Sequence, residues 1–290
     1  ASSPRSARSR VWALGFRNPF RMTIKPGTGS VNPSAGDIGE VYIGDVGWGT
    51  WEELNIVDKK GQNCGWPLFE GHTTLNSYYN LTTANPDEPN PLYNVNGCTQ
   101  QYFTFKNLLK QATADNIKTV FNPCNASQAI GTNERYFHRR PTIDWKHGED
   151  NARVGIFSGN NAATALIGTP ASNVVGTPFR GNAAVAGCWY TGNSFPVQYR
   201  NTFFAADYGG QWLKSFTVNF TDVLQKVENF ATGFLAVVSI VQNPLDGSIF
   251  CVDLGNSTIK RIAYGGNQLP VAVMTSDKTF GPSSLNVNFT

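Results

Sequence analysis

The sequence predicts an all-β protein built from short antiparallel strands. Charged residues make up only 15% of the 290 residues, while 29 glycines and 16 prolines supply many turn positions. This composition is typical of a turn-rich β protein and differs from that of a coiled coil or a disordered chain. Strand-length apolar runs recur between the turns, and none carries helix caps or a long 3.6-residue period. A chain of this length forms one large β domain or two ordinary ones.

The clearest strands lie in residues 240–264, "IVQNPLDGSIFCVDLGNSTIKRIAY". This segment alternates strand, Pro–Leu–Asp–Gly turn, strand, Gly–Asn turn and strand, which predicts an antiparallel meander. A meander of this kind is the unit from which a propeller blade is built.

A long polar insertion, at about residues 72–140, interrupts the strand pattern. Its segment 105–121, "FKNLLKQATADNIKTVF", has apolar residues at helical spacing and is predicted to be helical. Insertions of this length usually act as functional lids or ordered decorations.

Cysteines and glycosylation sequons indicate an extracellular protein. The five cysteines are scattered and include no C-x-x-C, which argues against a zinc site. Cys98 and Cys124 flank one polar stretch of the insertion and are the predicted disulfide, while the pairing of the other three stays open. N-x-[ST] sequons, which together with these cysteines predict a secreted glycoprotein, occur at Asn80, Asn125, Asn219, Asn256 and Asn288.

The charge and the two ends of the chain add little about partners. A formal charge of +3 is too small to imply nucleic acid binding. Residues 1–10 contain Arg5, Arg8 and Arg10, which form either a solvated end or a protease processing site. No run of about 18 apolar residues and no signal peptide is present, so we expect the gene to begin upstream of residue 1.

Residues 267–290 change in character after "RIAYGG". Their pattern, P-x-A followed by G-P-x-x-L-x-V-x-F, resembles the first strands of a PKD-type immunoglobulin-like sandwich. Because part of a sandwich cannot bury its inner face, we expect the natural protein to continue beyond residue 290.

Four segments carry a resemblance to a known family. They are, in order, "GFRNPFR" at 15–21, "GDVGWGTWEELNIV" at 44–57, "GQNCGWPLFEG" at 61–71 and "FFAADYGGQWLKSFTV" at 203–218. The series resembles the glucose/sorbosone dehydrogenase family, which includes soluble quinoprotein sugar dehydrogenases and the propeller of hedgehog-interacting-protein-like proteins. The resemblance spans roughly residues 10–265 and implies a six-bladed β-propeller of which this chain is the later blades. The predicted propeller domain is therefore 11–266, between the basic segment 1–10 and the PKD-like segment 267–290.

The R-N-P motif is the predicted cofactor contact. Pro19 fixes its own φ and pushes Asn18 into an extended conformation, so Arg17 and Asn18 are expected to project from a strand end toward the propeller axis. Arginine offers a planar fork for carboxylates, and asparagine adds donors and an acceptor. The resemblance implies that Arg17 and Asn18 contact pyrroloquinoline quinone (PQQ), which is rich in carboxylates. In the alternative interpretation, Arg17 ties down a neighbouring loop.

The glycine-broken acidic segment 44–55 is the predicted Ca²⁺ site. Its glycines free the backbone to turn carbonyl oxygens inward, and hard oxygens suit calcium. The resemblance implies calcium ligation by the carbonyls of Gly47 and Trp48, where Trp48 replaces the proline usual in sugar dehydrogenases. Asp45, Glu52 and Glu53 are further predicted ligands. Glu52 and Glu53 either bind a second, structural calcium or form a solvated pair at a strand edge.

The catalytic groups of the family are not all matched. Sugar oxidation by a quinone requires a base for the hydroxyl proton, and the family's histidine lies upstream of R-N-P, where residues 1–16 contain none. His138 and His147 lie in "YFHRRPTIDWKHGED", which we interpret as a solvated turn rather than a loop at the mouth. The family's cations in the last blades have no match in "FFAADYGG" or "FATGFLAVVSIV".

Two functions therefore stay open. The first is a secreted PQQ- and calcium-dependent sugar oxidoreductase acting on an aldose or glycan. The second is a catalytically silent extracellular module that uses the same propeller to bind protein partners, with the missing upstream part of the propeller as a further partner. An open half-propeller would expose its strand edges and apolar blade faces.

Overall fold

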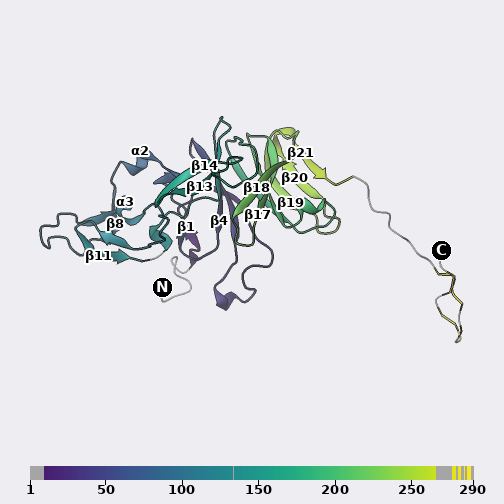
Figure 1. Cartoon of the computed structure of the whole chain (residues 1–290), viewed down its shortest axis with the longest axis horizontal. Coiled ribbons are helices and arrows are strands. Elements are labelled where there is room, and N and C mark those ends of the chain that lie inside the picture. Colours follow the sequence, from purple (N-terminus) through teal and green to yellow (C-terminus); the bar gives the residue numbers. More distant parts are fainter. Residues whose placement is uncertain are drawn as a thin grey trace.

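The computed structural model describes residues 10–132 and 134–265, together with 276–278, 280, 281, 284 and 286–288. Most of the predicted basic segment, including Arg5 and Arg8, and most of the PKD-like segment lie outside the described residues. The prediction of an all-β fold is confirmed, since helices are restricted to a few short turns (Figure 1).

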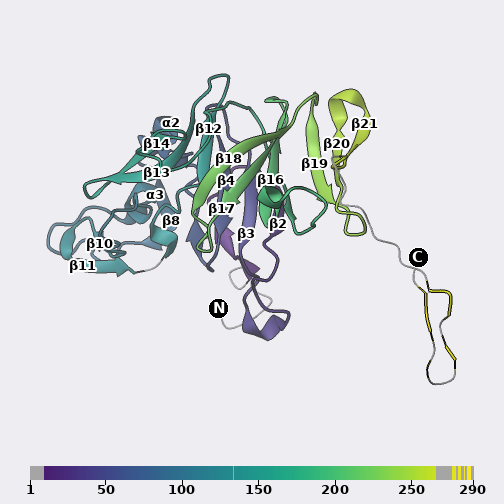
Figure 2. The ribbon, with the colours of Figure 1, turned by 45° about the vertical axis from the view of Figure 1, so that its right-hand side comes forward.

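Three antiparallel sheets make up the body of the molecule (Figure 2). The first has the order β14-β13-β12-β4-β3-β2, whose strands are Asn161–Leu166, Ala152–Ser158, Ile143–Lys146, Trp51–Val57, Val41–Asp45 and Pro19–Ile24. The second is the meander β15-β16-β17-β18, formed by Ala184–Tyr190, Thr202–Asp207, Trp212–Val218 and Leu224–Ala231. The third is β19-β20-β21, formed by Val237–Gln242, Ile249–Asp253 and Thr258–Ile262. The second and third have the strand order of propeller blades, and β2-β3-β4-β12 has the same order within the first.

The second sheet lies between the first and the third, and it is buried on both faces. Side chains alternate along β16, so Phe203 and Ala205 pack into the core shared with the first sheet. Phe204 and Ala206 point the other way, into the core shared with the third sheet. All four are nearly inaccessible to solvent. This explains why the run "FFAA" at residues 203–206 is continuously apolar rather than alternating.

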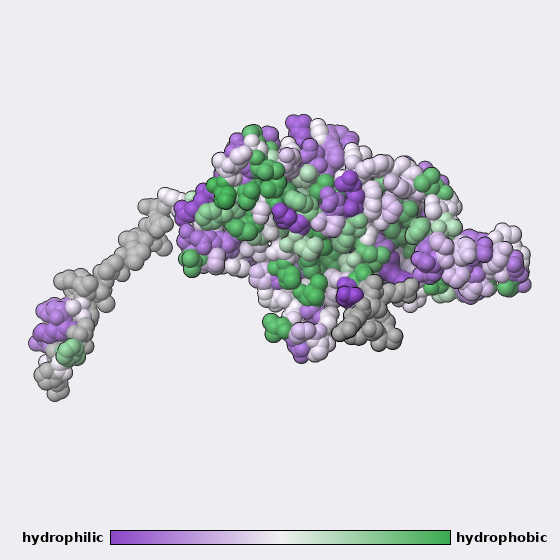
Figure 3. Space-filling view, turned by 180° about the vertical axis from the view of Figure 1, so that it is seen from behind, coloured by the Kyte–Doolittle hydropathy of each residue, from purple (hydrophilic) through white to green (hydrophobic). Residues whose placement is uncertain are grey.

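The first strands of the three sheets lie side by side. Strand β15 contacts both β2 and β19, and the Arg21 Nε donates to the Val238 carbonyl at 3.1 Å. The three strands line an open hollow of about 390 Å³. The sheets therefore radiate from a common inner edge. Hydrophobic residues also gather on the surface at the end that carries β19–β21 (Figure 3), where Val241, Val252 and Ile259 are exposed.

The insertion forms a lobe on the side of the first sheet that faces away from β19–β21 (Figure 1). It contains two hairpins and three short helical turns: β8 (Ala84–Pro89), β9 (Tyr102–Thr104), β10 (Val120–Asn122), β11 (Asn125–Gly131), α2 (Asn76–Tyr79), α3 (Phe105–Leu108) and η2 (Glu134–Tyr136). The predicted Cys98–Cys124 disulfide is confirmed, and the remaining three cysteines are free thiols. Two further strand pairs are β1 (Ala13–Leu14) with β5 (Gln62–Asn63), and β6 (Phe69–Glu70) with β7 (Thr73–Thr74).

The predicted helix over 105–121 is wrong beyond its first turn. A capping box between Thr104 and Asn107 starts α3, but Leu109 is already extended. Lys110 then leaves the helix to pair with the far end of the insertion, where its N–H donates to the Tyr136 carbonyl at 2.8 Å. Tertiary pairing therefore overrides the local helical pattern.

The asparagines of the glycosylation sequons differ in the exposure and the hydrogen bonding of their side-chain amides. Asn80 and Asn125 are exposed, whereas Asn219 is half-buried and its Oδ1 accepts from the Val223 N–H. The Nδ2 atoms of Asn256 and Asn288, which a glycan would modify, donate to aspartates at 2.5 and 3.0 Å. None of the described helices is long and apolar enough to cross a membrane.

Candidate functional site

In each blade, one buried aspartate binds the two residues that precede the first strand. We call these two residues the blade entrance. Asp45, Asp207 and Asp253 end the second strands β3, β16 and β20, and each is followed by any residue and then glycine. Each carboxylate accepts backbone N–H groups from the two residues that precede the first strand of its own blade, at 2.7–3.0 Å for Asp45, 2.9–3.1 Å for Asp207 and 2.9–3.3 Å for Asp253. We call these the latch aspartates. They bring the three blade entrances to one edge of the molecule.

The latch uses only main-chain atoms of the residues it holds. The pair held by Asp45 is Arg17–Asn18, whereas the second and third blades have Asn182–Ala183 and Leu235–Ala236. Alanine and leucine satisfy the same hydrogen bonds, so the latch itself does not require arginine and asparagine side chains in the first blade. Their presence calls for a reason other than the latch.

Arg17 and Asn18 are both exposed at the entrance of the first blade. The Arg17 Nη1 donates to the carbonyl of Val46 at 3.1 Å, which places the guanidinium beside the glycine turn, residues 46–50. The main-chain N–H of Val46 in turn donates to the Asn18 carbonyl at 3.0 Å. The structure therefore brings the predicted cofactor contacts next to the predicted calcium turn.

Two buried glutamates hold the amides of the glycine turn. Glu70 Oε1 accepts from the N–H groups of Trp48, Gly49 and Thr50 at 2.8–3.0 Å, and Glu52 Oε1 accepts from Gly47 at 3.2 Å. Although burial raises the pKa of Glu70, these hydrogen bonds outweigh burial and lower it. The amides thus point toward carboxylates, and the carbonyls of Gly47 and Trp48 accept no hydrogen bond from the described residues. A side chain at Gly47 would meet the Trp51 carbonyl at 1.9 Å.

The structure pairs Asp45 with Glu53 across β3 and β4, but it does not gather Asp45, Glu52 and Glu53 at one calcium site. Glu52 and Glu53 are consecutive in β4 and lie on opposite faces of the sheet. Glu52 Oε2 accepts from the Ala184 N–H at 2.6 Å, and Glu53 Oε1 accepts from Gly71 at 2.5 Å. Both are buried, so the alternative of a solvated pair is wrong. No three His, Cys, Asp or Glu side chains in the described part of the chain could hold a metal ion.

His147 lies beside the glycine turn, not in a solvated turn as predicted. Its Nε2 lies 2.6 Å from Glu52 Oε1, and its side chain is 24% exposed. Its backbone N–H donates to the Thr50 carbonyl at 3.0 Å. The hydrogen bond to Glu52 raises the pKa of His147. No local sequence pattern indicates this pair, because Glu52 and His147 are separated by 95 residues.

The other two histidines are buried under the insertion. His138 stacks on Phe69 with ring centroids 4.3 Å apart, and its Nδ1 lies 2.9 Å from Gln111 Oε1. The expectation of a solvated turn is therefore wrong for His138 as well. Burial lowers the pKa of His72 to about 4 and that of His138 to about 3, so both are neutral at physiological pH.

The turn that follows Asp207 in the second blade, residues 208–211, carries no cation. The turn after Asp207 offers Tyr208, which is 42% exposed. Lys214 lies inside β17 and is buried, with its Nζ bonded to Asn229 Oδ1. Burial lowers the pKa of Lys214 to about 8. The Arg17–Asn18 pair of the candidate site comes from the first blade, while Arg180 and Asn182 are exposed at the start of the second.

The chain is similar to parts of several longer known proteins. No family model matches the chain. Over 61 residues it is 38% identical to the HIPL1 protein of Arabidopsis thaliana, a stretch covering 21% of this chain and 7% of that protein. The soluble aldose sugar dehydrogenase of Escherichia coli, in its apo form, is similar over 83% of this chain and 42% of its own, with 16% identity and a TM-score of 0.36.

The PQQ-bound aldose sugar dehydrogenase of Streptomyces coelicolor is similar over 87% of this chain and 41% of its own. Its identity is 12% and the TM-score 0.36. In both solved structures the match spans less than half of the relative's length.

Proposed function

We propose that the entrance of the first blade is a cofactor site for calcium-dependent, PQQ-type sugar oxidation in a secreted glycoprotein. One observation carries the proposal: Arg17 and Asn18 stand beside a turn with two free carbonyls, in a position where the other blades show that no charged side chain is needed. The sequence resemblance supplies the identity of the cofactor.

The residues present fit such a group. The Arg17 guanidinium can pair with a carboxylate in a planar, bidentate manner, and the Asn18 amide adds a donor and an acceptor. The carbonyls of Gly47 and Trp48 are hard oxygen ligands suited to calcium. When bound, PQQ supplies the electron acceptor and calcium supplies Lewis acidity. Glu70 and Glu52 keep the ligating turn fixed before any ligand arrives.

His147 is the proton acceptor in this proposal. It alone among the three histidines has an exposed ring, because His72 and His138 are buried. Glu52 accepts a hydrogen bond from Nε2, so Nδ1 is the nitrogen left to take a proton. The buried carboxylate orients the ring and stabilises its charged form, which is the usual role of the third member of a catalytic triad.

The test uses the full chain with PQQ and Ca²⁺, and follows reduction of a dye with a series of aldoses. The proposal predicts dye reduction that needs both additions and is lost on chelation. Arg17→Leu is the matched variant that removes the proposed cofactor contact, because Leu235 occupies the equivalent position in the third blade. If neither dye reduction nor a calcium-dependent change in quinone absorbance occurs, the sugar oxidoreductase is rejected.

A silent extracellular binding module is the second candidate. It is favoured by the lack of a cation in residues 208–211 of the second blade, where Tyr208 and glycines take the place of charged groups. In that case the entrance binds a protein partner without redox chemistry. Arg17→Leu would then weaken partner capture while quinone titration gave no signal in either protein.

A further inference from the structure

Three aromatic side chains form an exposed cluster at the junction of the first blade and the insertion. The ring centroids are 6.3 Å apart for Trp48 and Trp66, 5.5 Å for Trp48 and Tyr78, and 5.7 Å for Trp66 and Tyr78. Trp48 is 53% exposed and Tyr78 is 36% exposed. We call these three residues the aromatic surface. They come from the glycine turn, from the "GWP" segment and from α2.

The aromatic surface is held in place before any ligand binds. The backbone of Trp48 is fixed through Glu70, and the Trp66 N–H donates to the Gly15 carbonyl at 2.9 Å. A large apolar side chain that is both rigid and half exposed gains little from folding. It is, however, a suitable contact for a ligand, because little side-chain entropy is lost on binding.

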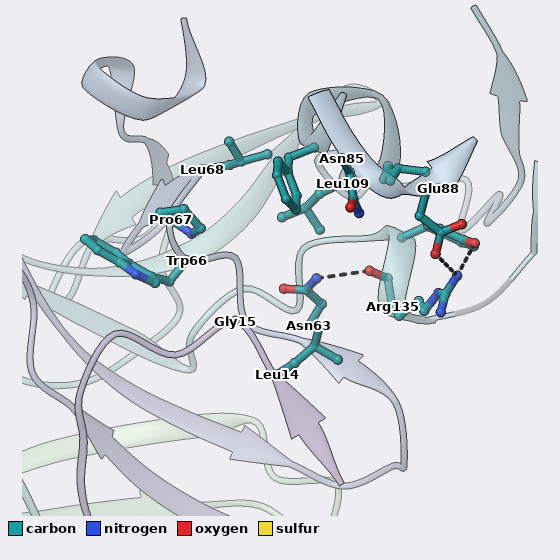
Figure 4. A pocket seen from close by; sticks show the side chains of 13 residues that line it. Leu14, Gly15, Asn63, Trp66, Pro67, Leu68, Asn85, Glu88, Leu109 and Arg135 are labelled. Carbon is teal, nitrogen blue, oxygen red and sulfur yellow. Dashed lines mark hydrogen bonds and ion pairs between the residues drawn. The ribbon is translucent and has the colours of Figure 1, made fainter. Parts of the chain in front are cut away.

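A cavity of about 260 Å³ adjoins the aromatic surface and shares Trp66 with it (Figure 4). Leu109 and Phe105 contribute to an apolar lining, which contains several more side chains from both the insertion and the first blade. Trp66 lies at one end of the cavity in the figure, and the Glu88–Arg135 pair lies at the other. The aromatic surface and the cavity therefore form one continuous strip across the junction.

The polar groups of the cavity select the kind of ligand. Its charged lining residues, Glu88 and Arg135, pair with each other at 3.4 Å, so the cavity has no net charge to attract an ion. Asn85 accepts from the Asp87 N–H through Oδ1, which leaves its Nδ2 as a donor at the cavity. Carbohydrate rings offer C–H faces that pack on aromatic rings and hydroxyl groups that pair with amides and carboxylates.

From these observations we infer that the aromatic surface and the adjoining cavity bind a neutral oligosaccharide. The non-reducing or internal sugar units lie against Trp48 and Tyr78, and a neighbouring unit enters the cavity past Trp66. The strip extends over two separate parts of the fold, so the ligand is a chain of sugars rather than a single ring. Binding requires neither calcium nor quinone and stands apart from the proposed oxidation.

The test measures binding of the full chain to soluble oligosaccharides from cellulose, xylan, mannan, chitin and starch, by tryptophan fluorescence and calorimetry, with a chelator present and no quinone. At least one series is expected to bind, with affinity that rises with chain length. Trp48→Ala and Tyr78→Ala are each expected to weaken binding about tenfold. Trp48→Phe is expected to keep most of the affinity, because it retains an aromatic face.

Phe220→Ala is the matched control, since Phe220 is an aromatic residue that is 93% exposed on the turn between β17 and β18. It is expected to bind like the parent chain, and unfolding midpoints confirm that each variant is folded. The inference is overturned if the parent chain binds none of the five series, or if Phe220→Ala loses as much affinity as Trp48→Ala. Because the assay contains no cofactor, its result is independent of whether the sugar oxidation occurs.

Discussion

Replacing Glu70 by alanine should be among the most damaging single changes outside the apolar cores. Glu70 is 2% exposed, and its Oε1 accepts the main-chain N–H groups of Trp48, Gly49, Thr50 and Trp51 at 2.8–3.3 Å. Its Oε2 accepts the Thr50 hydroxyl at 2.7 Å. Alanine removes the charge and leaves four amides without their acceptor.

The expected loss follows from these contacts. A hydrogen bond to a charged group contributes about 1.5–3 kcal/mol to stability. The total for Glu70 is smaller than the sum of its hydrogen bonds, because four donors share one oxygen and the turn lies near solvent. We therefore expect Glu70→Ala to lower the free energy of unfolding by about 3–5 kcal/mol. Glu70→Gln keeps the shape and one acceptor oxygen, so we expect a loss of about 1–2 kcal/mol.

Denaturant unfolding of the three proteins, followed by tryptophan fluorescence, gives these values. Calcium titration on the same samples adds a second readout, because a loosened turn should hold its carbonyls less well. The reasoning is refuted if Glu70→Ala is within about 1 kcal/mol of the parent chain, or if Glu70→Gln costs as much as Glu70→Ala.

Three further predictions concern the latch, the buried histidines and the glycans. Asp207→Ala should lower the free energy of unfolding by about 3–5 kcal/mol in denaturant titration, because a buried carboxylate that accepts several N–H groups is lost; a change below about 1 kcal/mol would contradict the latch. The folded pKa values of His72 and His138 lie near 4 and 3, below the unfolded value near 6.5, so the unfolded chain binds more protons and stability falls as pH drops below about 6.5. Each histidine contributes up to about 1.4 kcal/mol per pH unit to the pH dependence of the free energy of unfolding. The carboxylates titrate equally in both proteins, so the variant with glutamine at both His72 and His138 should show a smaller pH dependence than the parent chain. Equal pH dependence in the two proteins would be evidence against neutral buried histidines. On secretion from eukaryotic cells, peptide mapping should find glycans at Asn80 and Asn125 but not at the sequon in η4 (Leu254–Asn256), and the reverse pattern would refute the argument from amide hydrogen bonds.

The strands were predictable because their signals are local. Continuous apolar runs such as "FFAA" and the turns of residues 240–264 indicate strands and their antiparallel order within a few residues of sequence. The Cys98–Cys124 pair was predictable for the same reason, since it closes one stretch of the insertion. The helix over 105–121 failed because Lys110 pairs with Tyr136, a partner that no local pattern reveals.

The candidate site was predictable in part. The R-N-P motif and the glycine turn were both singled out in the sequence, and the structure places Arg17 and Asn18 beside residues 46–50. Glu70 and His147 were missed, because their partners lie about 20 and 95 residues away and only the folded chain brings them together. The latch did leave a signal in the sequence, because Asp-x-Gly recurs after three strand-like runs. Aligning those runs would have indicated that Asp45 is a structural residue like Asp207 and Asp253, and not a calcium ligand.

Calcium-dependent binding of PQQ to the double variant Arg17→Leu/Asn18→Ala tests the central claim most directly. This variant gives the first blade the residues that the third blade carries at 235 and 236. The account predicts that the parent chain shows saturable, calcium-dependent quinone binding, and that the double variant loses it while its free energy of unfolding changes by less than about 0.5 kcal/mol. Unchanged quinone binding in a stable double variant, or none by the parent chain, would contradict it.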